Sequence, residues 1–395
     1  MTPAARLGAA VEVLDAVIAA ARDNGPAADT ILANYFKNRR YAGSKDRRAV
    51  RGLVYAAIRL CGERPVTGRA AVLALAEAQP DLQPLFGVAP HGPPPANGDE
   101  PRAEQGIAPA WLVDSLTASG IDIDAQAALL GRAPLDIRAN RLKTTRDYLL
   151  DELPAATLLG HDPDALRLEE STSVEQLATF SEGRAEVQDA GSQLVARAAG
   201  AVAGMRVVDL CAGAGGKTLA LAAHMGNQGQ ILASDTDRGR LSRLPPRAAR
   251  AGVTIAETRL LNPNREAEAL LDWQGSADLV VVDAPCSGTG TWRRNPEARW
   301  RLTPERLDRL AATQARLFGI AADLVKPGGA LTYIVCSLLN REGADQVAAF
   351  LAASPGWQAE PLEIAAGEPH ALGVRLHPLA SDTDGFFVAR LRRPC

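Results

Sequence analysis

The segment 279–290 limits what this chain can fold into more than any other stretch. Four apolar residues at its start are typical of a buried parallel strand. This strand ends in Asp283, a proline and Cys286, and small residues follow. Ligands of open α/β sheets bind outside the carboxyl ends of the strands, so we expect Asp283 and Cys286 to face a substrate there. A second apolar run, 331–335, leads in the same way into Cys336.

The pattern around these two segments predicts an α/β fold. From Gln188 onward, short apolar runs alternate with helical patterns. This alternation is typical of βαβ units that form a doubly wound, mostly parallel sheet. We predict strands at 206–210, 231–235, 278–283, 331–336 and 386–391.

The chain of 395 residues is too long for one typical domain. Helical periodicity predicts helices over 5–35, with a turn at 24–26, and over 45–61 and 70–86. A Pro/Gly-rich stretch follows, and then a mixed segment with a helix at 110–119, a strand at 135–140 and a helix over 146–153, for which Thr144 and Thr145 are cap candidates. We therefore predict a helical domain at 1–88, a linker at 89–106, a small α+β middle subdomain at 107–187 and a catalytic domain at 188–395.

Charge is unevenly distributed. The net charge of −3 argues against a uniformly basic nucleic-acid binder. Residues 36–70, however, hold ten Lys or Arg against Asp46 and Glu63 only. A solvated helix face is the simple interpretation of one such cluster, but the density of this one favours contact with phosphates. The cations concerned are Lys37, Arg39, Arg40, Lys45, Arg47, Arg48 and Arg51.

A second polar group allows two interpretations. Arg138, Asn140, Arg141 and Lys143 follow or lie in the strand predicted at 135–140. They form either another phosphate-facing patch or a set of structural contacts, and the sequence favours neither.

Other sequence features indicate a cytoplasmic protein. We find no apolar run of eighteen or more residues and no signal-peptide pattern. The five cysteines are widely spaced and form no CxxC pair or metal-ligand cluster. We therefore expect reduced thiols, no metal and no membrane partner, and we expect a monomer.

The glycine-rich loop 211–218 follows a predicted strand that ends at Asp209. A P-loop would need glycine where Cys211 stands, and a dinucleotide fingerprint would need glycine where Thr218 stands. The remaining interpretation is the loop that binds S-adenosylmethionine in Rossmann-like methyltransferases. Asp235 ends the next predicted strand, where a carboxylate holds a ribose diol.

The two thiols and Asp283 match the needs of one reaction. Carbon 5 of cytosine becomes nucleophilic when a thiolate adds to carbon 6. The resulting ring needs a proton or a hydrogen bond at N3, for which an acid such as Asp283 is suited. After methylation, a base must remove the proton on carbon 5. One cysteine can attack, and the other is available for release.

Several motifs of the chain resemble those of RNA 5-methylcytosine methyltransferases, specifically the bacterial RsmB (Sun/Fmu) family that modifies 16S ribosomal RNA. The resemblance rests first on Asp283-Ala-Pro-Cys-Ser-Gly-Thr-Gly and on Val335-Cys336-Ser337. It extends over nearly the whole chain. The other similar segments lie at 188–194, 293–297 with Trp300, 326–329, 384–387 and 134–140, and the segment from Asp46 to Tyr55 resembles part of a NusB-like helical domain.

The resemblance implies roles for individual residues. Cys336 would be the nucleophile, Cys286 would assist product release, and Asp283 would support the target base. DNA cytosine methyltransferases use the cysteine of their Pro-Cys motif instead, which would make Cys286 the nucleophile. The family's acid at the end of the third strand is absent here, so Asn262 or the backbone would contact adenine. The predicted cofactor residues are Cys211, Ala212, Gly213, Ala214, Gly215, Gly216, Lys217, Asp235, Arg240, Asn262 and Asp283.

The expected function is methyl transfer from S-adenosylmethionine to carbon 5 of a cytosine in RNA, with 16S rRNA or a small-subunit assembly intermediate as partner. A target base inside a helix would have to be flipped out. Two alternatives are the same chemistry on tRNA and a non-catalytic RNA-binding factor for ribosome assembly.

Overall fold

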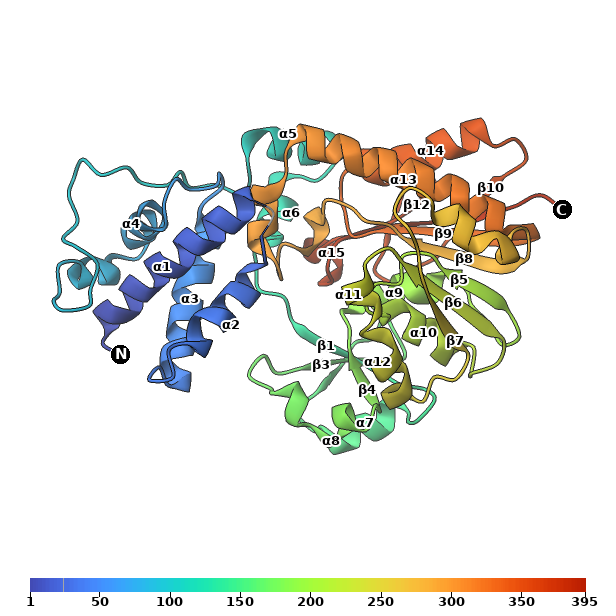
Figure 1. The fold of residues 1–395 in the computed structure, drawn as a ribbon, viewed down its shortest axis with the longest axis horizontal. Helices are drawn as coiled ribbons and strands as arrows, with labels where there is room; N and C mark the ends of the chain where they lie inside the picture. Colours follow the sequence, from blue (N-terminus) through green and yellow to red (C-terminus); the bar gives the residue numbers. More distant parts are fainter. Residues whose placement is uncertain (24) are drawn as a thin grey trace. The chain divides into compact units, whose positions relative to one another are not determined.

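The computed structural model describes residues 1–23 and 25–395, and it separates into two compact units (Figure 1). The first unit comprises Met1–Arg132 together with Thr291–Pro304. The second comprises Ala133–Gly290 and Glu305–Cys395. The turn predicted at 24–26 includes Asn24, which lies outside the described residues.

The first unit is helical. The apolar faces of α1 and α3 supply much of its core, with Val13, Leu14 and Val17 packed near Val50 and Val54. The helices predicted up to residue 61 are confirmed. The helix predicted at 70–86 ends at Ala78, and a 3-10 turn that contains Pro80 and Pro84 follows it. Proline lacks the backbone N–H that a longer helix would need at these positions. The elements are α1 (Pro3–Arg22), α2 (Ala28–Lys37), α3 (Ser44–Leu60), α4 (Gly68–Ala78), η1 (Pro80–Leu85), α5 (Ala110–Ala118), α6 (Ile123–Ala128) and η5 (Pro296–Arg301).

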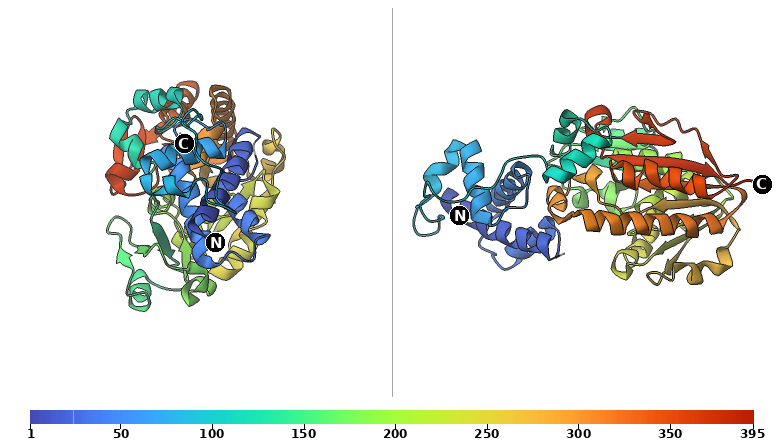
Figure 2. Two further views of the ribbon diagram at one scale, coloured as in Figure 1. Left: turned by 90° about the vertical axis from the view of Figure 1, so that its left-hand side faces the viewer. Right: turned by 90° about the horizontal axis from the view of Figure 1, so that it is seen from above.

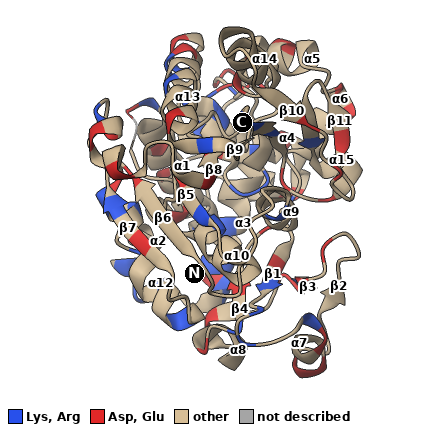
Figure 3. Ribbon diagram, turned by 90° about the vertical axis from the view of Figure 1, so that its right-hand side faces the viewer, with Lys and Arg blue, Asp and Glu red and all other residues tan. Residues whose placement is uncertain are grey.

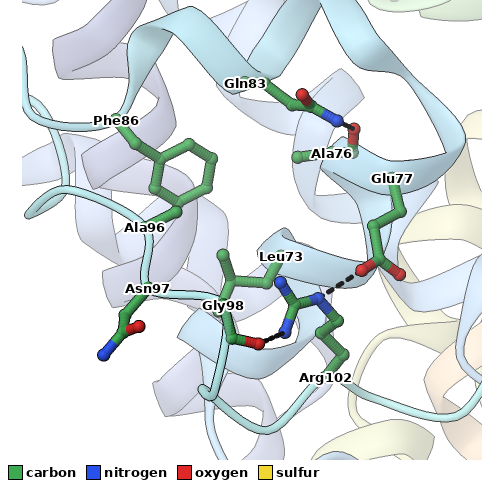
Figure 4. Close-up of a pocket in the computed structure, with 9 residues that line it drawn as sticks. All are labelled: Leu73, Ala76, Glu77, Gln83, Phe86, Ala96, Asn97, Gly98 and Arg102. Carbon is green, nitrogen blue, oxygen red and sulfur yellow. Dashed lines mark hydrogen bonds and ion pairs between the residues drawn. The ribbon is translucent and has the colours of Figure 1, made fainter.

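The Pro/Gly-rich segment 89–106 packs against this unit. The Arg69 guanidinium on α4 donates to the carbonyls of Pro94 and Pro95, at 3.2 and 2.9 Å. A hollow of about 220 Å³ lies between α4, η1 and this segment (Figure 4). Its polar groups contact one another, since Arg102 pairs with Glu77 and donates to the Gly98 carbonyl at 3.0 Å.

The segment 291–304 also belongs to the helical unit, although it follows the first cysteine loop in sequence. Arg299 is fully buried, and its guanidinium donates to the carbonyls of Ile58 at 2.6 Å and Cys61 at 2.8 Å. The last carbonyls of a helix have no partner within it, so Arg299 satisfies the end of α3. At the start of α2, the Glu297 carboxylate accepts the Ala28 N–H at 2.9 Å.

We predict that Arg299→Ala destabilises the helical unit by about 3 kcal/mol, because two buried carbonyls lose a charged donor. Calorimetric or spectroscopic thermal unfolding measures the change. Arg48→Ala, an exposed arginine on α3, is the matched control and should leave the transition within about 0.5 kcal/mol of wild type. Equal transitions for both variants would contradict the role of Arg299.

The second unit contains a nine-stranded sheet with the order β11-β12-β13-β9-β8-β5-β6-β7, and β10 pairs with β13. Strands β7, β6, β5, β8 and β9 are parallel, and β13 is antiparallel to β9. All five predicted strands are present, and β9 starts earlier than expected, at Val325. The strands are β5 (Arg206–Asp209), β6 (Gln230–Asp235), β7 (Ala256–Leu260), β8 (Ala277–Asp283), β9 (Val325–Val335), β10 (Gln358–Glu360), β11 (Glu368–His370), β12 (Gly373–Leu376) and β13 (Phe386–Arg392).

Helices cover both faces of this sheet. Alternate residues of a strand point to opposite faces: Val207 and Val281 pack with α9, α10 and α12, whereas Val208 and Val280 pack with α13 and α14. The long helix α13, orange in Figures 1 and 2, runs along its face of the sheet. The helices of this unit are α9 (Ala190–Ala198), α10 (Gly216–His224), α11 (Arg238–Leu241), α12 (Leu244–Ala251), α13 (Pro304–Leu324, of which Pro304 belongs to the first unit), α14 (Ala344–Ala353) and α15 (Pro378–Ser381).

A small antiparallel sheet, β2 (Thr157–Leu158), β3 (Ala165–Leu168), β1 (Leu135–Ala139) and β4 (Ala185–Val187), also belongs to the second unit, with α7 (Arg146–Glu152) and α8 (Ala178–Ser181). Thr145 caps α7 by accepting the Tyr148 N–H. The boundary between the units, at 132/133, falls inside the range 107–187 that we predicted as a middle subdomain. The division of the chain into four parts stays a prediction.

The second polar group has structural contacts. Arg138 is buried and donates to the Gln188 side chain at 2.7 Å, and Asn140 donates to the carbonyls of Gly183 and Ala251. Arg141 pairs with Asp164, and Lys143 donates to backbone carbonyls. The structural interpretation is therefore the one that the fold supports.

The cations of the basic block differ in their surroundings. Lys37, Arg40, Lys45 and Arg48 are exposed on the helical unit. Arg39, by contrast, pairs with Glu12 and stacks over the Tyr35 ring. Elsewhere cations and anions alternate, as along α13 in Figure 3. Among the described residues, none of the helices combines the length and the apolar character needed to cross a membrane.

Candidate active site

The predicted site residues lie at the carboxyl ends of neighbouring strands of the large sheet. The strand order turns back at β5, which lies between β6 and β8, and such a switch point is where open α/β sheets bind ligands. Asp209 ends β5, Asp235 ends β6 and Asp283 ends β8. Cys336 directly follows β9. Because these strands are parallel, their carboxyl ends, and with them the four residues, lie on the same side of the sheet.

The two thiols are in contact. The Sγ atoms of Cys286 and Cys336 lie 3.3 Å apart, and both residues are partly exposed. Backbone hydrogen bonds hold the first loop against the end of β9, because the Ala284 N–H donates to Ile334 at 2.9 Å and the Gly290 N–H donates to Cys336 at 3.0 Å. A flat ring can therefore meet both sulfurs at once.

The two thiols are not equivalent. Contact with Cys336, followed by burial, raises the pKa of the Cys286 thiol well above its ordinary value. A thiol whose pKa is raised is a poorer source of thiolate, so this direction argues against Cys286 as the attacking sulfur.

Asp283 is joined to the glycine loop. The Lys217 ammonium lies 2.6 Å from the Asp283 carboxylate, and only 7% of Lys217 is exposed. The ion pair therefore connects the start of α10 to the end of β8, on the two sides of the switch point. The sequence placed both residues in the site but did not predict their pairing.

The glycine loop has a shape that side chains would block. Gly213 and Gly215 have φ angles of +54° and +88°, which other residues rarely adopt. A Cβ atom at Gly213 would lie 2.5 Å from the Arg240 guanidinium. The Gly213 N–H donates to Asp235 at 2.7 Å, and the Asp237 N–H donates to the other oxygen of the same carboxylate. Asp235 is thereby fixed at the end of β6.

Asp209 is a fully buried acid with one free oxygen. Its Oδ2 atom accepts the Thr218 hydroxyl at 2.6 Å, whereas Oδ1 has no hydrogen-bond partner among the described residues. Burial raises the pKa of Asp209 to about 7. An unpartnered carboxylate oxygen next to a small-residue loop fits the positively charged amino group expected of a bound S-adenosylmethionine.

The remaining predicted cofactor residues differ in position. Cys211 packs against the core beneath the sheet edge, and burial raises the pKa of its thiol well above the ordinary value, as expected of an inert cysteine. Ala212 and Ala214 lie in the loop, and Gly216 has open space beside it. Asn262 is exposed just after β7, where its carbonyl accepts the Arg265 N–H.

The sequence interpretation missed Glu342 and the two serines that follow the cysteines. Glu342 is fully buried and accepts hydrogen bonds from Ser287 and Ser337. The repeated Cys-Ser pair at two strand ends was the available signal. Within the described chain, no group of His, Cys, Asp and Glu side chains has the arrangement of a metal site.

Comparison with known proteins agrees with this geometry. Residues 201–392 match the family described as 16S rRNA methyltransferase RsmB/F. A probable ribosomal RNA small subunit methyltransferase B from Synechocystis is 35% identical over 306 residues, which cover 73% of this chain and 68% of that protein. The chain belongs to the RsmB/F family.

Two further proteins extend the comparison. The ribosomal RNA small subunit methyltransferase B of Klebsiella pneumoniae is 38% identical over 66% of this chain, and the match spans 59% of that relative's length. The crystal structure of NSun6 from Pyrococcus horikoshii with SFG has a TM-score of 0.63 at 20% identity, covering 71% of this chain and 97% of that one. This RsmB/F chain therefore shares its fold with that protein.

The buried Asp209 gives a test by pH. Its folded pKa of about 7 exceeds the ordinary value of 3.8, so the folded state holds a proton between these values that the unfolded state has lost. Stability therefore falls as pH rises through this window. Between pH 5 and 8 we expect wild type to lose about 3 kcal/mol relative to Asp209→Asn, a difference that removes the contributions of groups common to both proteins, such as His224.

Denaturant unfolding at the two pH values measures this difference. Asp151→Asn, on an exposed acid of the same unit, controls for the change of residue type and should keep the pH dependence of wild type. If the stabilities of Asp209→Asn and wild type change equally between pH 5 and 8, Asp209 does not carry the proton.

Proposed function

We propose that this protein transfers a methyl group from S-adenosylmethionine to carbon 5 of a cytosine in 16S rRNA, by way of a covalent bond between Cys336 and carbon 6. The observation that carries the proposal is the 3.3 Å contact between the Cys286 and Cys336 sulfurs beside Asp283. Family membership supports an RNA methyltransferase. The names of the relatives support small-subunit rRNA as the substrate.

Attack and release use different thiols in this proposal. The Cys336 thiolate adds to carbon 6, and the electrons of the 5,6 double bond move to carbon 5. Carbon 5 takes the methyl group as the bond from that methyl to the sulfonium sulfur of the donor breaks, which leaves a neutral thioether. Cys286 then removes the proton on carbon 5. The double bond re-forms and the bond from carbon 6 to Cys336 breaks, which returns the thiolate. Carbons 5 and 6 are bonded to each other, so two sulfurs in contact suit the two steps.

The bond that forms between Cys336 and carbon 6 explains how Cys286 changes its role. Contact with Cys336 is the largest cause of the raised pKa of Cys286. Once the Cys336 sulfur is bonded to carbon 6 as a thioether, that cause is removed. Cys286 then releases its proton to solvent more readily, and the resulting thiolate serves as the base. The order of the two steps therefore follows from the contact between the sulfurs.

Asp283 and Lys217 support the target base. Their 2.6 Å ion pair presents a carboxylate and an ammonium group at the end of β8. Negative charge develops on the ring when Cys336 adds, and a cation or a proton donor at N3 and O2 stabilises it. Lys217 supplies the charge, and Asp283 orients it and contacts the N3 side of the ring.

The glycine loop and Asp235 hold the methyl donor in this proposal. S-adenosylmethionine supplies an electrophilic methyl group when bound. The Asp235 carboxylate would accept the ribose hydroxyls, and the Asp209 oxygen that has no partner among the described residues would accept from the amino group of the methionine part. A relative in fold was solved with SFG, an analogue of S-adenosylmethionine.

Replacement of each cysteine separates the roles. Cys336→Ala should abolish methyl transfer to RNA, since this proposal assigns the bond to carbon 6 to Cys336 and only proton removal at carbon 5 to Cys286. Cys286→Ala should attack and methylate but fail to release, and so accumulate an adduct that survives denaturation. Radiolabel transfer and denaturing gels measure both effects. Full activity of Cys336→Ala, or an adduct that forms in Cys286→Ala and persists after Cys336 is also replaced, would contradict this assignment.

The same adduct identifies the RNA. We would incubate Cys286→Ala with total RNA and S-adenosylmethionine and sequence the RNA that remains bound after denaturation. Enrichment of one 16S segment is expected. Enrichment of tRNA would overturn the substrate, and absence of cofactor binding in calorimetry would favour a non-catalytic assembly factor.

A further inference from the structure

A buried glutamate connects the two cysteine loops. Glu342 ends the 3-10 turn η6 (Asn340–Glu342), and its side chain is completely inaccessible to solvent. The proposed attack and release do not use it. Burial of a carboxylate is costly unless hydrogen bonds compensate, so its contacts indicate why the position is occupied by an acid.

One set of contacts reaches the loop of Cys286. The Oε1 atom of Glu342 accepts the Ser287 N–H at 2.8 Å, and Oε2 accepts the Ser287 hydroxyl. The Ser287 N–H belongs to the peptide group that joins this serine to Cys286. Because a peptide group is planar, fixing its N–H also fixes the backbone on the carboxyl side of Cys286.

A second set reaches the loop of Cys336. The same Oε2 atom accepts the Ser337 hydroxyl at 2.6 Å. Ser337 in turn lies 3.1 Å from the Thr289 hydroxyl and accepts the Leu339 N–H at 3.2 Å. Tyr333, on β9 itself, donates its hydroxyl to the Glu342 carbonyl at 2.6 Å. Glu342 is thus tied both to the residue after Cys336 and to the strand before it.

Helix α13 holds the carboxylate from the other side. The Gln314 amide donates to Glu342 Oε1 at 3.1 Å and to the Pro285 carbonyl at 2.9 Å. Pro285 precedes Cys286, so the residues on both sides of this cysteine are fixed by one connected network. Gln314 is itself fully buried.

The directions of these hydrogen bonds require an acceptor on both oxygens. Ser287 contributes an N–H and an O–H, Ser337 an O–H and Gln314 an N–H. An ionised carboxylate has only acceptors and satisfies all four donors. Both serine hydroxyls donate to the same oxygen, Oε2, and their own oxygens lie 3.2 Å apart.

We propose that Glu342 is a positioning residue that holds Cys286 and Cys336 at the spacing that product release requires. The inference rests on the proposed function. Attack on carbon 6 uses one sulfur alone. Release uses both, because Cys286 must reach the proton on carbon 5 while Cys336 is still bonded to carbon 6. A looser connection between the loops therefore slows release more than attack.

The test compares two substitutions of Glu342. Glu342→Asp keeps the charge but shortens the side chain, so it cannot reach both serines. Glu342→Gln keeps the reach and removes the charge. Each variant is incubated with transcribed 16S rRNA and S-adenosylmethionine, and both turnover and the fraction of protein in a denaturation-resistant adduct are measured. Glu175→Gln, on an exposed glutamate of the same unit, is the matched control.

We expect Glu342→Asp to lower turnover about tenfold to a hundredfold while the adduct fraction rises several-fold above wild type. Glu342→Gln should lie between Glu342→Asp and wild type, and Glu175→Gln should match wild type. Cofactor binding by calorimetry confirms that a variant is folded. Loss of turnover and adduct in equal proportion would overturn the proposal, because a merely structural role would weaken both steps, and unchanged turnover would overturn it as well.

Milder variants keep the test decisive if substitution of Glu342 prevents folding. Ser287→Ala and Ser337→Ala each remove one hydroxyl donor, and each should raise the ratio of adduct to turnover to a smaller extent. A ratio equal to wild type in both serine variants would overturn the proposal. Wild type and Cys286→Ala are assayed in parallel. If wild type does not methylate the RNA and Cys286→Ala does not trap it, the proposed function itself fails. That outcome differs from a failure confined to the Glu342 and serine variants.

Discussion

The parallel pairing of β8 with β9 is the constraint on which the site depends. In its register, Asp283 stands beside Ile334 and Val282 beside Tyr333. The two strands therefore end at the same level, and the residues that follow them meet at a sulfur-to-sulfur distance of 3.3 Å. A shift by one residue would turn every side chain of a strand to the opposite face. Close packing of both strands on the two faces of the sheet opposes such a shift, because side chains of different shape would have to exchange places.

Several acids that are costly to bury lie at or just beyond the carboxyl ends of these strands. Asp209 and Glu342 are inaccessible to solvent, and Asp235 is nearly so. Their environments differ in a way that matches their proposed roles. Glu342 has donors on both oxygens, so it is suited to hold structure, whereas Asp209 keeps one oxygen without a partner among the described residues, so it is suited to a ligand. The hydrogen-bond partners of each oxygen, and not burial, thus distinguish a structural carboxylate from one that is available for binding.

Much of the large sheet could be predicted from sequence because its strands are continuous apolar runs that end in polar residues. Strand β7 was harder to recognise, since its residues Ala256–Leu260 are partly exposed at the sheet edge and mostly polar. The role of Glu342 could not be predicted, because its contacts depend on the tertiary meeting of two loops. The segment 291–304 posed the same difficulty: Arg299 caps a helix that lies 241 residues earlier in the chain.

The central claim is that the thiol after β9 attacks the base and the thiol after β8 releases it. The most direct measurement uses the wild-type protein with S-adenosylmethionine and 16S rRNA transcribed with 5-fluorocytidine. A fluorine on carbon 5 cannot leave as a proton does, so the methylated ring should stay bonded to the nucleophile. Mass spectrometry of the digested adduct then locates the nucleotide. The account predicts that it is attached to Cys336; attachment to Cys286 would contradict it.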